Sequence, residues 1–449
     1  MTIARASNRP MMTGEGDNPM AWYGLALLTI SYALAYVDRQ MLNLLVDPIK
    51  TSLDISDTQF SFVQGTAFVT AYLCAAPVFG RLVDVGNRRN ILVFGVFVWS
   101  LCTALCGLAD SYPALFMARL GVGVSEACIV PVSMSLIGDL FAPGRMARAQ
   151  SIFYIGVQLG GGISLLAGGL VIAFADELRG HVGALAGLTT WQMAFVIIGL
   201  PGLLYAIFLF TFREPARRQS MVDDESTRQM TMRDVIVLLW ERRHFYGRIY
   251  IAIGLIGIVQ LGMPSWFPSF LIRTHGVSAE QTGLQLGLLS ISAGTIGTLL
   301  GPAGARWLER RGYVDAQLRA SALALILMLA SCFAIPLAPG RIGALTAAAG
   351  VFFSCGFPLG IVAAATQNAS PGRMRGVVAS LYSFFAQLIG YMIGPTLIAL
   401  CTDRVFGDPK MVGYSMQIVM SCASLGACLL MFSVLPHFRA LLSGSGRTS

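Results

Sequence analysis

The chain has 449 residues, of which 55% are hydrophobic and 12% are charged. Globular domains carry about 25% charged residues, so this composition excludes an ordinary water-soluble fold and predicts an integral membrane protein. The formal net charge is +8, and its distribution along the chain decides whether it reflects nucleic-acid binding or membrane topology.

Twelve apolar stretches are long enough to cross about 30 Å of hydrocarbon as helices. We therefore expect an all-α membrane protein with twelve transmembrane helices. The expected helices lie at residues 21–46, 59–80, 90–109, 113–137, 148–175, 189–212, 248–272, 281–303, 318–337, 341–367, 374–400 and 413–435.

The basic residues alternate with these helices. Of the 31 Lys and Arg residues, 23 lie in the tails and even-numbered loops and six in the odd-numbered loops, while Arg39 and Arg119 lie within helices. By the positive-inside rule, both termini are expected to be cytoplasmic. The net charge thus reflects topology, and no nucleic-acid partner is expected. Only Lys50 and Lys410 are lysines, which is typical of GC-rich bacterial genomes and favours a bacterial inner membrane.

Four ionisable residues fall within the first and fourth expected helices: Asp38, Arg39, Arg119 and Glu126. At 1.5 Å per residue, Arg39 lies about 27 Å from the inner end of its helix, and Arg119 and Glu126 lie about 9 Å and 20 Å from the outer end of theirs. Each costs at least about 2.5–3.5 kcal/mol to insert, so such residues face a cavity or a partner. We interpret them as a charge switch that couples to protons. The alternative is a static ion-pair cluster that only joins the two helices.

Polar and aromatic side chains recur at helical spacing near these charges. For any one of them, ordinary hydrogen bonding between helices is an equally good explanation. As a set they predict a cavity with one charged wall and one apolar or aromatic wall, which suits an amphiphile. The candidate cavity residues are Tyr32, Tyr36, Arg39, Asn43, Ser133, Tyr154, Gln158, Phe357, Ser383, Gln387 and Tyr391.

Two internal repeats divide the chain into halves. "PGRMARAQS" from Pro143 resembles "PGRMRGVVAS" from Pro371, and "GRLVDVGNRRN" from Gly80 weakly resembles "GARWLERRGYVDAQ" from Gly304. Because the offsets of 228 and 224 each span six helices, the halves should run parallel. We expect a cytoplasmic tail at 1–20, a six-helix bundle at 21–212, a cytoplasmic linker at 213–247, a second bundle at 248–436 and a cytoplasmic tail at 437–449.

The linker contains "MTMRDVIVLLWERR" from Met230. Met232, Val235, Ile236 and Leu239 are spaced to share one face of a helix, which predicts an amphipathic helix on the inner membrane surface. A linker without regular structure is the alternative.

This plan resembles the major facilitator superfamily, whose transport site lies between two six-helix halves near the bilayer midplane. "GRLVDVGNRR" is similar to the superfamily's signature loop at Gly80, Asp84, Arg88 and Arg89 and departs from it at Val85 and Asn87. The resemblance implies an inner gate in which Asp84 faces the start of the eleventh helix. The expected gate residues are Gly80, Asp84, Arg88, Arg89, Arg145 and Arg373.

Within the superfamily, the first half resembles the spinster-like transporters. The matching motifs are "YVDRQML" in the first helix, the asparagine of "GNRR", and "RLGVGVSEACIVPVSMSLIGDLF" in the fourth helix. Spinster-like proteins are associated with sphingolipids, sphingosine phosphates and lysophospholipids. The duplicated halves and the acid within the membrane favour a proton-coupled transporter that works by alternating access. The resemblance, together with the two-walled cavity, implies a lysolipid or a sphingolipid-like amphiphile as its substrate.

Other functions remain as alternatives. A small organic anion such as a sugar acid or an aromatic acid would bind Arg39 and Arg119, and a non-transporting receptor or scaffold could share the fold. An enzyme is not expected, because the sequence has no HExxH or GxSxG motif and only four scattered histidines. A phosphate-binding GxxxxGK[ST] loop is also missing. We expect no cofactor and no metal, protons as the coupling ion, membrane lipid and the substrate as partners, and a monomer.

Overall fold

The structure, a computed structural model, describes residues 19–181, 187–215, 217, 232–370 and 375–445. Within these ranges twelve helical spans are long and apolar enough to cross a membrane, and there is no β-strand, which confirms the predicted fold class. In chain order the elements are α1 (Pro19–Met41), η1 (Leu42–Leu44), α2 (Val46–Leu53), α3 (Asp57–Ser61), η2 (Phe62–Ala67), α4 (Phe68–Val85), α5 (Arg88–Cys106), α6 (Tyr112–Glu126), α7 (Ile129–Leu140), α8 (Pro143–His181), α9 (Thr190–Phe208), η4 (Leu209–Thr211), α10 (Met232–Glu241), α11 (Arg243–His275), α12 (Ala279–Arg310), α13 (Ala316–Ala334), α14 (Gly340–Asn368), α15 (Arg375–Gln387), η6 (Leu388–Ile393), α16 (Gly394–Leu400), η7 (Cys401–Phe406), η8 (Pro409–Met411) and α17 (Val412–Ser445).

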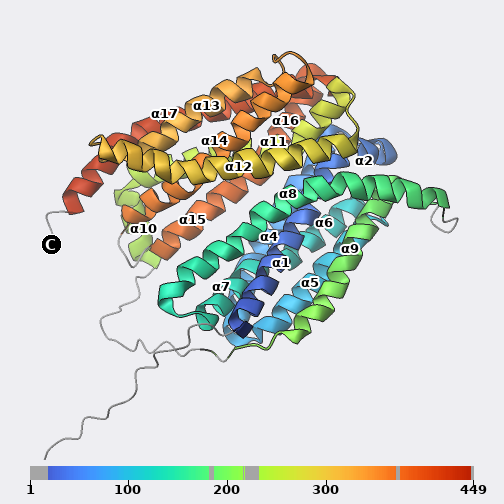
Figure 1. Cartoon of the computed structure of the whole chain (residues 1–449), viewed down its shortest axis with the longest axis horizontal. Helices are drawn as coiled ribbons and strands as arrows, with labels where there is room; N and C mark the ends of the chain where they lie inside the picture. Colours follow the sequence, from blue (N-terminus) through green and yellow to red (C-terminus); the bar gives the residue numbers. More distant parts are fainter. Residues whose placement is uncertain (1–18, 182–186, 216, 218–231, 371–374, 446–449) are drawn as a thin grey trace, which may run out of the picture.

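The helices form two bundles, α1–α9 and α11–α17. At one end the bundles contact each other through α3 with α16 and through η1 with α11. We call this the Arg273 end. At the opposite end, which we call the Arg88 end, the ribbons of the two bundles are well separated, near α7 and α10 (Figure 1). The molecule is therefore closed between its halves at the Arg273 end.

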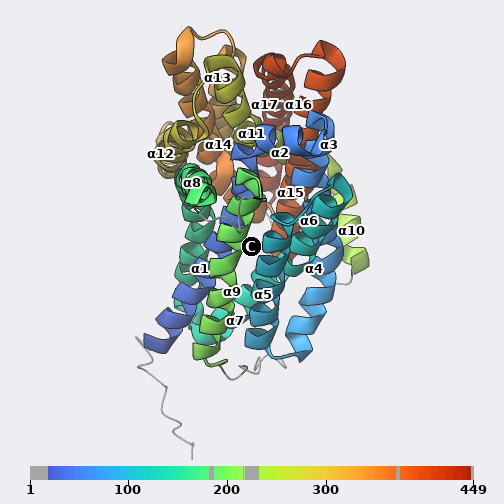
Figure 2. The ribbon, with the colours of Figure 1, turned by 90° about the vertical axis from the view of Figure 1, so that its right-hand side faces the viewer.

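A long seam between α8 and α12 also joins the halves (Figure 2). The helix backbones touch at Gly283, where an added Cβ would lie 2.3 Å from the carbonyl oxygen of Leu165. Gly162 and Gly169 of α8 likewise abut Ile291 and Glu280 of α12. The close contacts thus lie in the part of each helix nearer the Arg273 end.

The fourth span is broken directly after Glu126. The sequence predicts one helix over 113–137, whereas the structure has α6 ending at Glu126 and α7 starting at Ile129. Pro131 explains the break, because proline has no N–H to donate to the carbonyl of Ala127 four residues earlier. Glu126 therefore lies at a helix end in the middle of a membrane span.

Two π-helical segments, one from each bundle, pack on each other. η2 interrupts the second span and η6 interrupts the eleventh, and the two segments are in contact. At Gly65, an added Cβ would lie 2.3 Å from the carbonyl oxygen of Tyr391. Only glycine therefore permits this approach of the two halves. Single π-helical turns are frequent at functional sites.

The linker contains the helix α10, so this part of it has regular structure. The side chains of residues 232–236 lie outside the described residues, as does most of the linker before them. At its end, Arg242 donates to the carbonyl oxygen of Ala369 at 2.9 Å. The last helix, α17, continues to Ser445, well past the apolar run at 413–435.

Candidate functional site

The centre of the N-terminal bundle contains a buried ion pair between α1 and α6. Arg39 Nε donates to Glu126 Oε2 at 2.7 Å, and Arg39 Nη2 donates to the same oxygen. The side chains of Arg39 and Glu126 are 5% and 0% exposed. The other carboxylate oxygen, Oε1, is buried and accepts no hydrogen bond among the described residues. The Arg39 guanidinium thus binds one oxygen of the Glu126 carboxylate. The other oxygen, Oε1, is the atom that could carry a proton.

The other two charges of the predicted switch are not part of this pair. Asp38 accepts a hydrogen bond from Thr103 Oγ1 of α5 at 3.0 Å, and within the described residues it forms no ion pair with either arginine. Arg119 is buried, and its Nε and Nη1 atoms have no hydrogen-bond partner in the described part of the chain. The structure therefore holds a buried guanidinium with unused donors. A buried polar group without partners is costly, so such donors favour an anionic or water ligand.

Aromatic rings surround the Arg39 guanidinium. Its Cζ lies 4.3 Å from the ring centre of Phe68, 4.9 Å from that of Tyr36 and 5.8 Å from that of Tyr72. Each ring attracts a cation through its negative face, and the attraction is stronger where water is excluded. Rings and Glu126 together enclose Arg39 on several sides.

A chain of side-chain amides runs beside the pair, at the junction of α1, η1 and η2. Gln64 Nε2 donates to Asn43 Oδ1, and Asn43 Nδ2 donates to Gln40 Oε1. Asn43 and Gln64 are 3% exposed. The chain therefore fixes the orientation of Gln40, whose Nε2 remains available.

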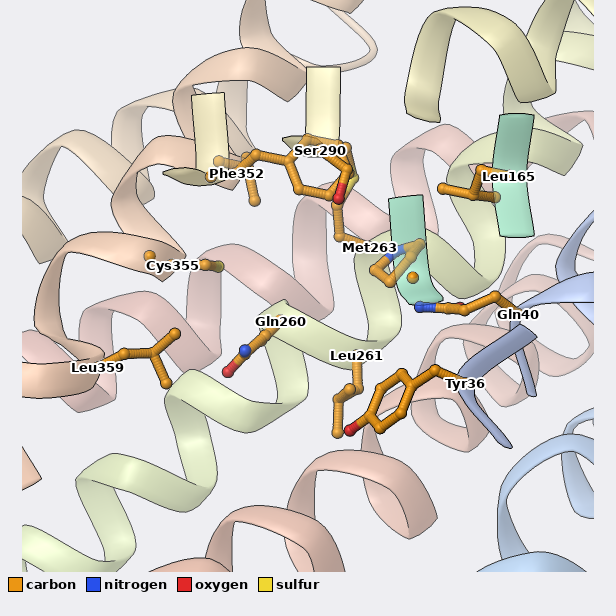
Figure 3. Close-up of a pocket in the computed structure, with 15 residues that line it drawn as sticks. Tyr36, Gln40, Leu165, Gln260, Leu261, Met263, Ser290, Phe352, Cys355 and Leu359 are labelled. Carbon is orange, nitrogen blue, oxygen red and sulfur yellow. The ribbon is translucent and has the colours of Figure 1, made fainter. Parts of the chain in front are cut away.

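Three cavities lie along α14, and two of them lie between the bundles. The widest, of about 600 Å³, is lined by α8, α12, α14 and α15, and a second, of about 100 Å³, is lined by α1, α8, α11, α12 and α14 (Figure 3). A third, of about 30 Å³, lies between α11, α14 and α15. Leu359 lines all three. The three cavities thus adjoin one another along α14, and we refer to them together as the α14 path.

Three predicted cavity residues line these spaces: Tyr36 lies in the second cavity, and Tyr154 and Ser383 lie in the widest. Arg39 and Gln387 instead share a very small cavity of about 10 Å³. The described residues that line the three larger cavities include no Asp, Glu, Lys or Arg. In this conformation the charged pair therefore lies beside the path and not in it.

The other predicted cavity residues whose side chains are described are enclosed by protein. The Tyr32 ring stacks on Phe153 with centres 4.7 Å apart. Tyr391, Asn43 and Ser133 are buried, and the Ser133 hydroxyl has no partner among the described residues. Phe357 packs against the glycines of α12. A Cβ added to Gly301 would lie 2.3 Å from the carbonyl oxygen of Phe357. The side chain of Gln158 lies outside the described residues.

At the Arg273 end, an ion-pair cluster joins the two bundles. Arg273, in the last turn of α11, donates from Nη1 and Nη2 to the two carboxylate oxygens of Asp57 at 2.9 Å each. Its Nε donates to Asp47 at 2.8 Å. Asp57 is 0% exposed and also accepts from Lys50 of its own bundle. We call Asp47, Asp57 and Arg273 the Arg273 latch, because it crosses from α2 and α3 to α11.

A sequence profile for the Major Facilitator Superfamily matches residues 28–395. The chain belongs to this superfamily. The chain is 25% identical over 388 residues to an MFS-type efflux pump of Mycolicibacterium smegmatis, with 86% of each protein covered. It is 24% identical to the sphingosine-1-phosphate transporter SPNS2 of Xenopus tropicalis, over 64% of this chain and 55% of that protein. It thus spans about half the length of the spinster relatives that it matches.

Solved structures share the fold of this superfamily member. A bacterial homologue of the human lysosomal transporter Spinster, in an inward-facing and unoccupied conformation, matches with a TM-score of 0.82 and 22% identity, over 95% of this chain and 99% of that chain. A D-xylose-proton symporter matches with a TM-score of 0.65 and 14% identity, over 90% and 97%. The family and its relatives are transporters by name, so the chain is a membrane transporter and not an enzyme.

The superfamily's signature loop lies at the Arg88 end. Arg88 is buried, and it donates to Glu214 Oε1 at 2.9 Å and pairs with Asp139. Arg89 donates to the carbonyl oxygen of Phe212 at 3.3 Å. Both arginines thus tie the loop to its own bundle.

The remaining gate residues differ in their surroundings. The side chain of Asp84 is exposed, and its backbone carbonyl oxygen accepts a hydrogen bond from Arg217. A Cβ on Gly80 would meet no atom within 4 Å. Arg145 is exposed at the start of α8. Arg373 lies outside the described residues, so a contact of Asp84 with the start of the eleventh helix stays a prediction.

Proposed function

We propose that this transporter is a proton-coupled secondary transporter that moves an amphiphile, a lysolipid or a sphingolipid-like molecule, by alternating access. Two observations carry this proposal. One is a wide cavity without charged lining residues, and the other is the buried Arg39–Glu126 pair, which lies against Tyr36 of the adjoining second cavity. An apolar path suits an acyl chain, and a guanidinium next to it suits an anionic head group. No further cofactor is required, because protons supply the coupling ion.

The names of the relatives support the lipid part of the proposal. SPNS2 of Xenopus tropicalis is named a sphingosine-1-phosphate transporter, and sphingosine 1-phosphate joins an anionic head to a long hydrocarbon tail. The residues that line the widest cavity support it independently, because Ile155, Leu359, Ala363, Val378 and Tyr382 offer mainly apolar contact.

The geometry of Glu126 supports the proposed coupling to protons. While its carboxylate is ionised, Glu126 occupies the guanidinium of Arg39, as in this structure. When Glu126 takes up a proton, Arg39 loses its counter-ion and becomes available to an anionic head group or to Asp38, the adjacent residue. A ligand shifts a conformational equilibrium only through such a differential interaction. The two pairings would then belong to different stages of the transport cycle.

We infer that the Arg88 end faces the cytoplasm and that the protein lies in a bacterial inner membrane as a monomer. The excess of arginine in the loops at this end supports the orientation by the positive-inside rule. Arginines also lie over aromatic rings there, which suits the headgroup level of a bilayer. The pairs are Arg89 with Phe210, Arg148 with Trp22, Arg243 with Trp240, Arg311 with Trp307 and Arg319 with Tyr313.

A small organic anion is the second candidate substrate. The buried donors Nε and Nη1 of Arg119, which have no partner among the described residues, favour it. A planar guanidinium binds a carboxylate or a phosphate through two parallel hydrogen bonds. This candidate differs from the first in needing no apolar path.

The proposed function is tested by ligand-induced stabilisation followed by flux. Purified protein is melted with lysophospholipids, sphingosine phosphate, sugar acids and aromatic acids, and the best ligand is then followed into proteoliposomes under a pH gradient. We expect a lysolipid or sphingosine phosphate to raise the melting temperature, because a ligand that binds only the folded state stabilises it. Stabilisation by a sugar acid alone would favour the second candidate, and binding without flux would indicate a receptor.

The orientation is tested by cysteine labelling in intact cells. We expect Ser52→Cys, at the Arg273 end, to react with a membrane-impermeant maleimide, and Glu241→Cys, beside α11 at the Arg88 end, to react only after the membrane is permeabilised. Both side chains are exposed, so a difference reports the side of the membrane. Labelling of Glu241→Cys in intact cells would overturn the inferred orientation.

A further inference from the structure

The second cavity contains uncharged polar side chains that the coupling scheme does not use. Gln40 of α1, Gln260 of α11 and Ser290 of α12 line it from both bundles (Figure 3). We propose that these three residues form a hydroxyl-binding subsite and that they set the preference between amphiphiles whose polar head carries a hydroxyl and those whose head does not. This inference rests on the proposed amphiphile transport.

Gln40 supplies hydrogen-bond donors to the cavity. Its Oε1 accepts from Asn43, which itself accepts from Gln64, so the oxygen is turned toward the protein. The nitrogen end of Gln40 points toward the cavity (Figure 3). Because two buried amides hold it, Gln40 is oriented before any ligand arrives, which lowers the entropy cost of binding.

Gln260 supplies acceptors from the opposite bundle. Pro264, one turn further along α11, has no N–H, so the backbone carbonyl of Gln260 lacks its usual helical donor. No described residue bonds to the side-chain amide of Gln260, and the side chain lies between the second and third cavities. Gln260 therefore offers a backbone acceptor and an amide that can both donate and accept.

This combination matches a hydroxyl better than an anion. A hydroxyl donates one hydrogen bond and accepts others, so it can donate to the side-chain amide oxygen of Gln260 and accept from the side-chain amide of Gln40. An anion without a cation partner would be costly in a cavity whose described lining holds no Lys or Arg. Tyr36 lines this cavity and its ring centre lies 4.9 Å from Arg39 Cζ. The hydroxyl subsite is thus adjacent to the charged pair.

The test uses two lipids that differ only in one hydroxyl, 1-O-hexadecyl-glycerol 3-phosphate and 3-hexadecyloxypropyl phosphate. Their dissociation constants are measured for the full chain and for Gln260→Met and Gln40→Met, which keep the side-chain length and remove the amide. We expect the wild type to bind the hydroxyl lipid about tenfold more tightly, because one hydrogen bond is worth up to about that factor. The preference should fall to about twofold or less in both variants.

Gln150→Met provides the matched control, because Gln150 lies on α8 and lines none of the described cavities; it should keep the tenfold preference. The ratio of two constants within one variant does not depend on how much of that variant is folded. Equal binding of the two lipids by the wild type, or a preference that survives in both variants, would overturn the subsite alone. Binding of neither lipid by the wild type would overturn the proposed function, and the subsite with it.

Discussion

Replacing Glu126 by glutamine should abolish proton-driven transport while ligand binding remains. Glutamine has nearly the shape of a protonated glutamate, so Arg39 would lack its counter-ion at every pH and stay available to an anionic head group. Ligand affinity, measured between about pH 5.5 and 8.5, should therefore become independent of pH. Proton-driven accumulation in proteoliposomes should fall at least about tenfold, because the variant cannot return to the paired arrangement.

Two further variants serve as a positive and a negative control for this result. Arg39→Ala should lose both binding and its pH dependence, and it should also lower the melting temperature, because a buried carboxylate without its partner costs about 3–5 kcal/mol. Glu309→Gln makes the same chemical change on the exposed end of α12 and should behave as the wild type. If Glu126→Gln keeps the wild-type pH profile in both assays, the pair is only structural.

Replacing Arg273 by glutamine should shift the transporter toward a conformation that is open at the Arg273 end. The change removes three charge-assisted bonds between the bundles, to Asp57 and Asp47, while Asp57 keeps Lys50. Hydrogen bonds to charged groups are worth about 1.5–3 kcal/mol each, and a net loss of about 2 kcal/mol changes the ratio of conformations roughly 30-fold. Spin labels at Ser52 and Val405, in a background without the native cysteines, should report longer distances.

Lys50→Gln provides the comparison for the Arg273 latch. It also removes a bond to Asp57, but Lys50 and Asp57 belong to the same bundle, so the distance distribution across the bundles should stay as in the wild type. Identical distributions in Arg273→Gln and the wild type would show that the latch does not hold this end closed.

The sequence predicts the helices well because membrane insertion is a local property. A run of about 20 apolar residues identifies a span whatever it packs against, and the internal repeat at Pro143 and Pro371 identifies the two halves. The break after Glu126 was foreseeable in principle, since Pro131 stands in "ACIVPVS". The Arg39–Glu126 contact follows from the cost of isolated charges in a membrane, which requires each to find a partner.

The Arg273 latch could not be predicted from the same signals. The three residues of the latch, Asp47, Asp57 and Arg273, lie near helix ends. Charged residues are common there, so the sequence does not indicate which residues will pair with one another. Thr58 and Asp403, which bond at 2.6 and 2.7 Å across the halves, are 345 residues apart. The amide chain from Gln64 to Gln40 was missed for a related reason, because single polar amides within apolar runs are common and their meeting depends on how the spans pack.

The backbone contact between Gly65 and Tyr391 has a mechanical consequence. No side chain separates the two π-helical segments there, so the two bundles meet directly through backbone atoms at this point. If this contact acts as the pivot, a bundle that tilts about it as a rigid body moves its two ends in opposite directions. Widening at the Arg273 end would then narrow the Arg88 end in the same movement. A continuous pore through the membrane, which would dissipate the proton gradient, is thereby avoided by geometry and needs no separate signal between the two ends.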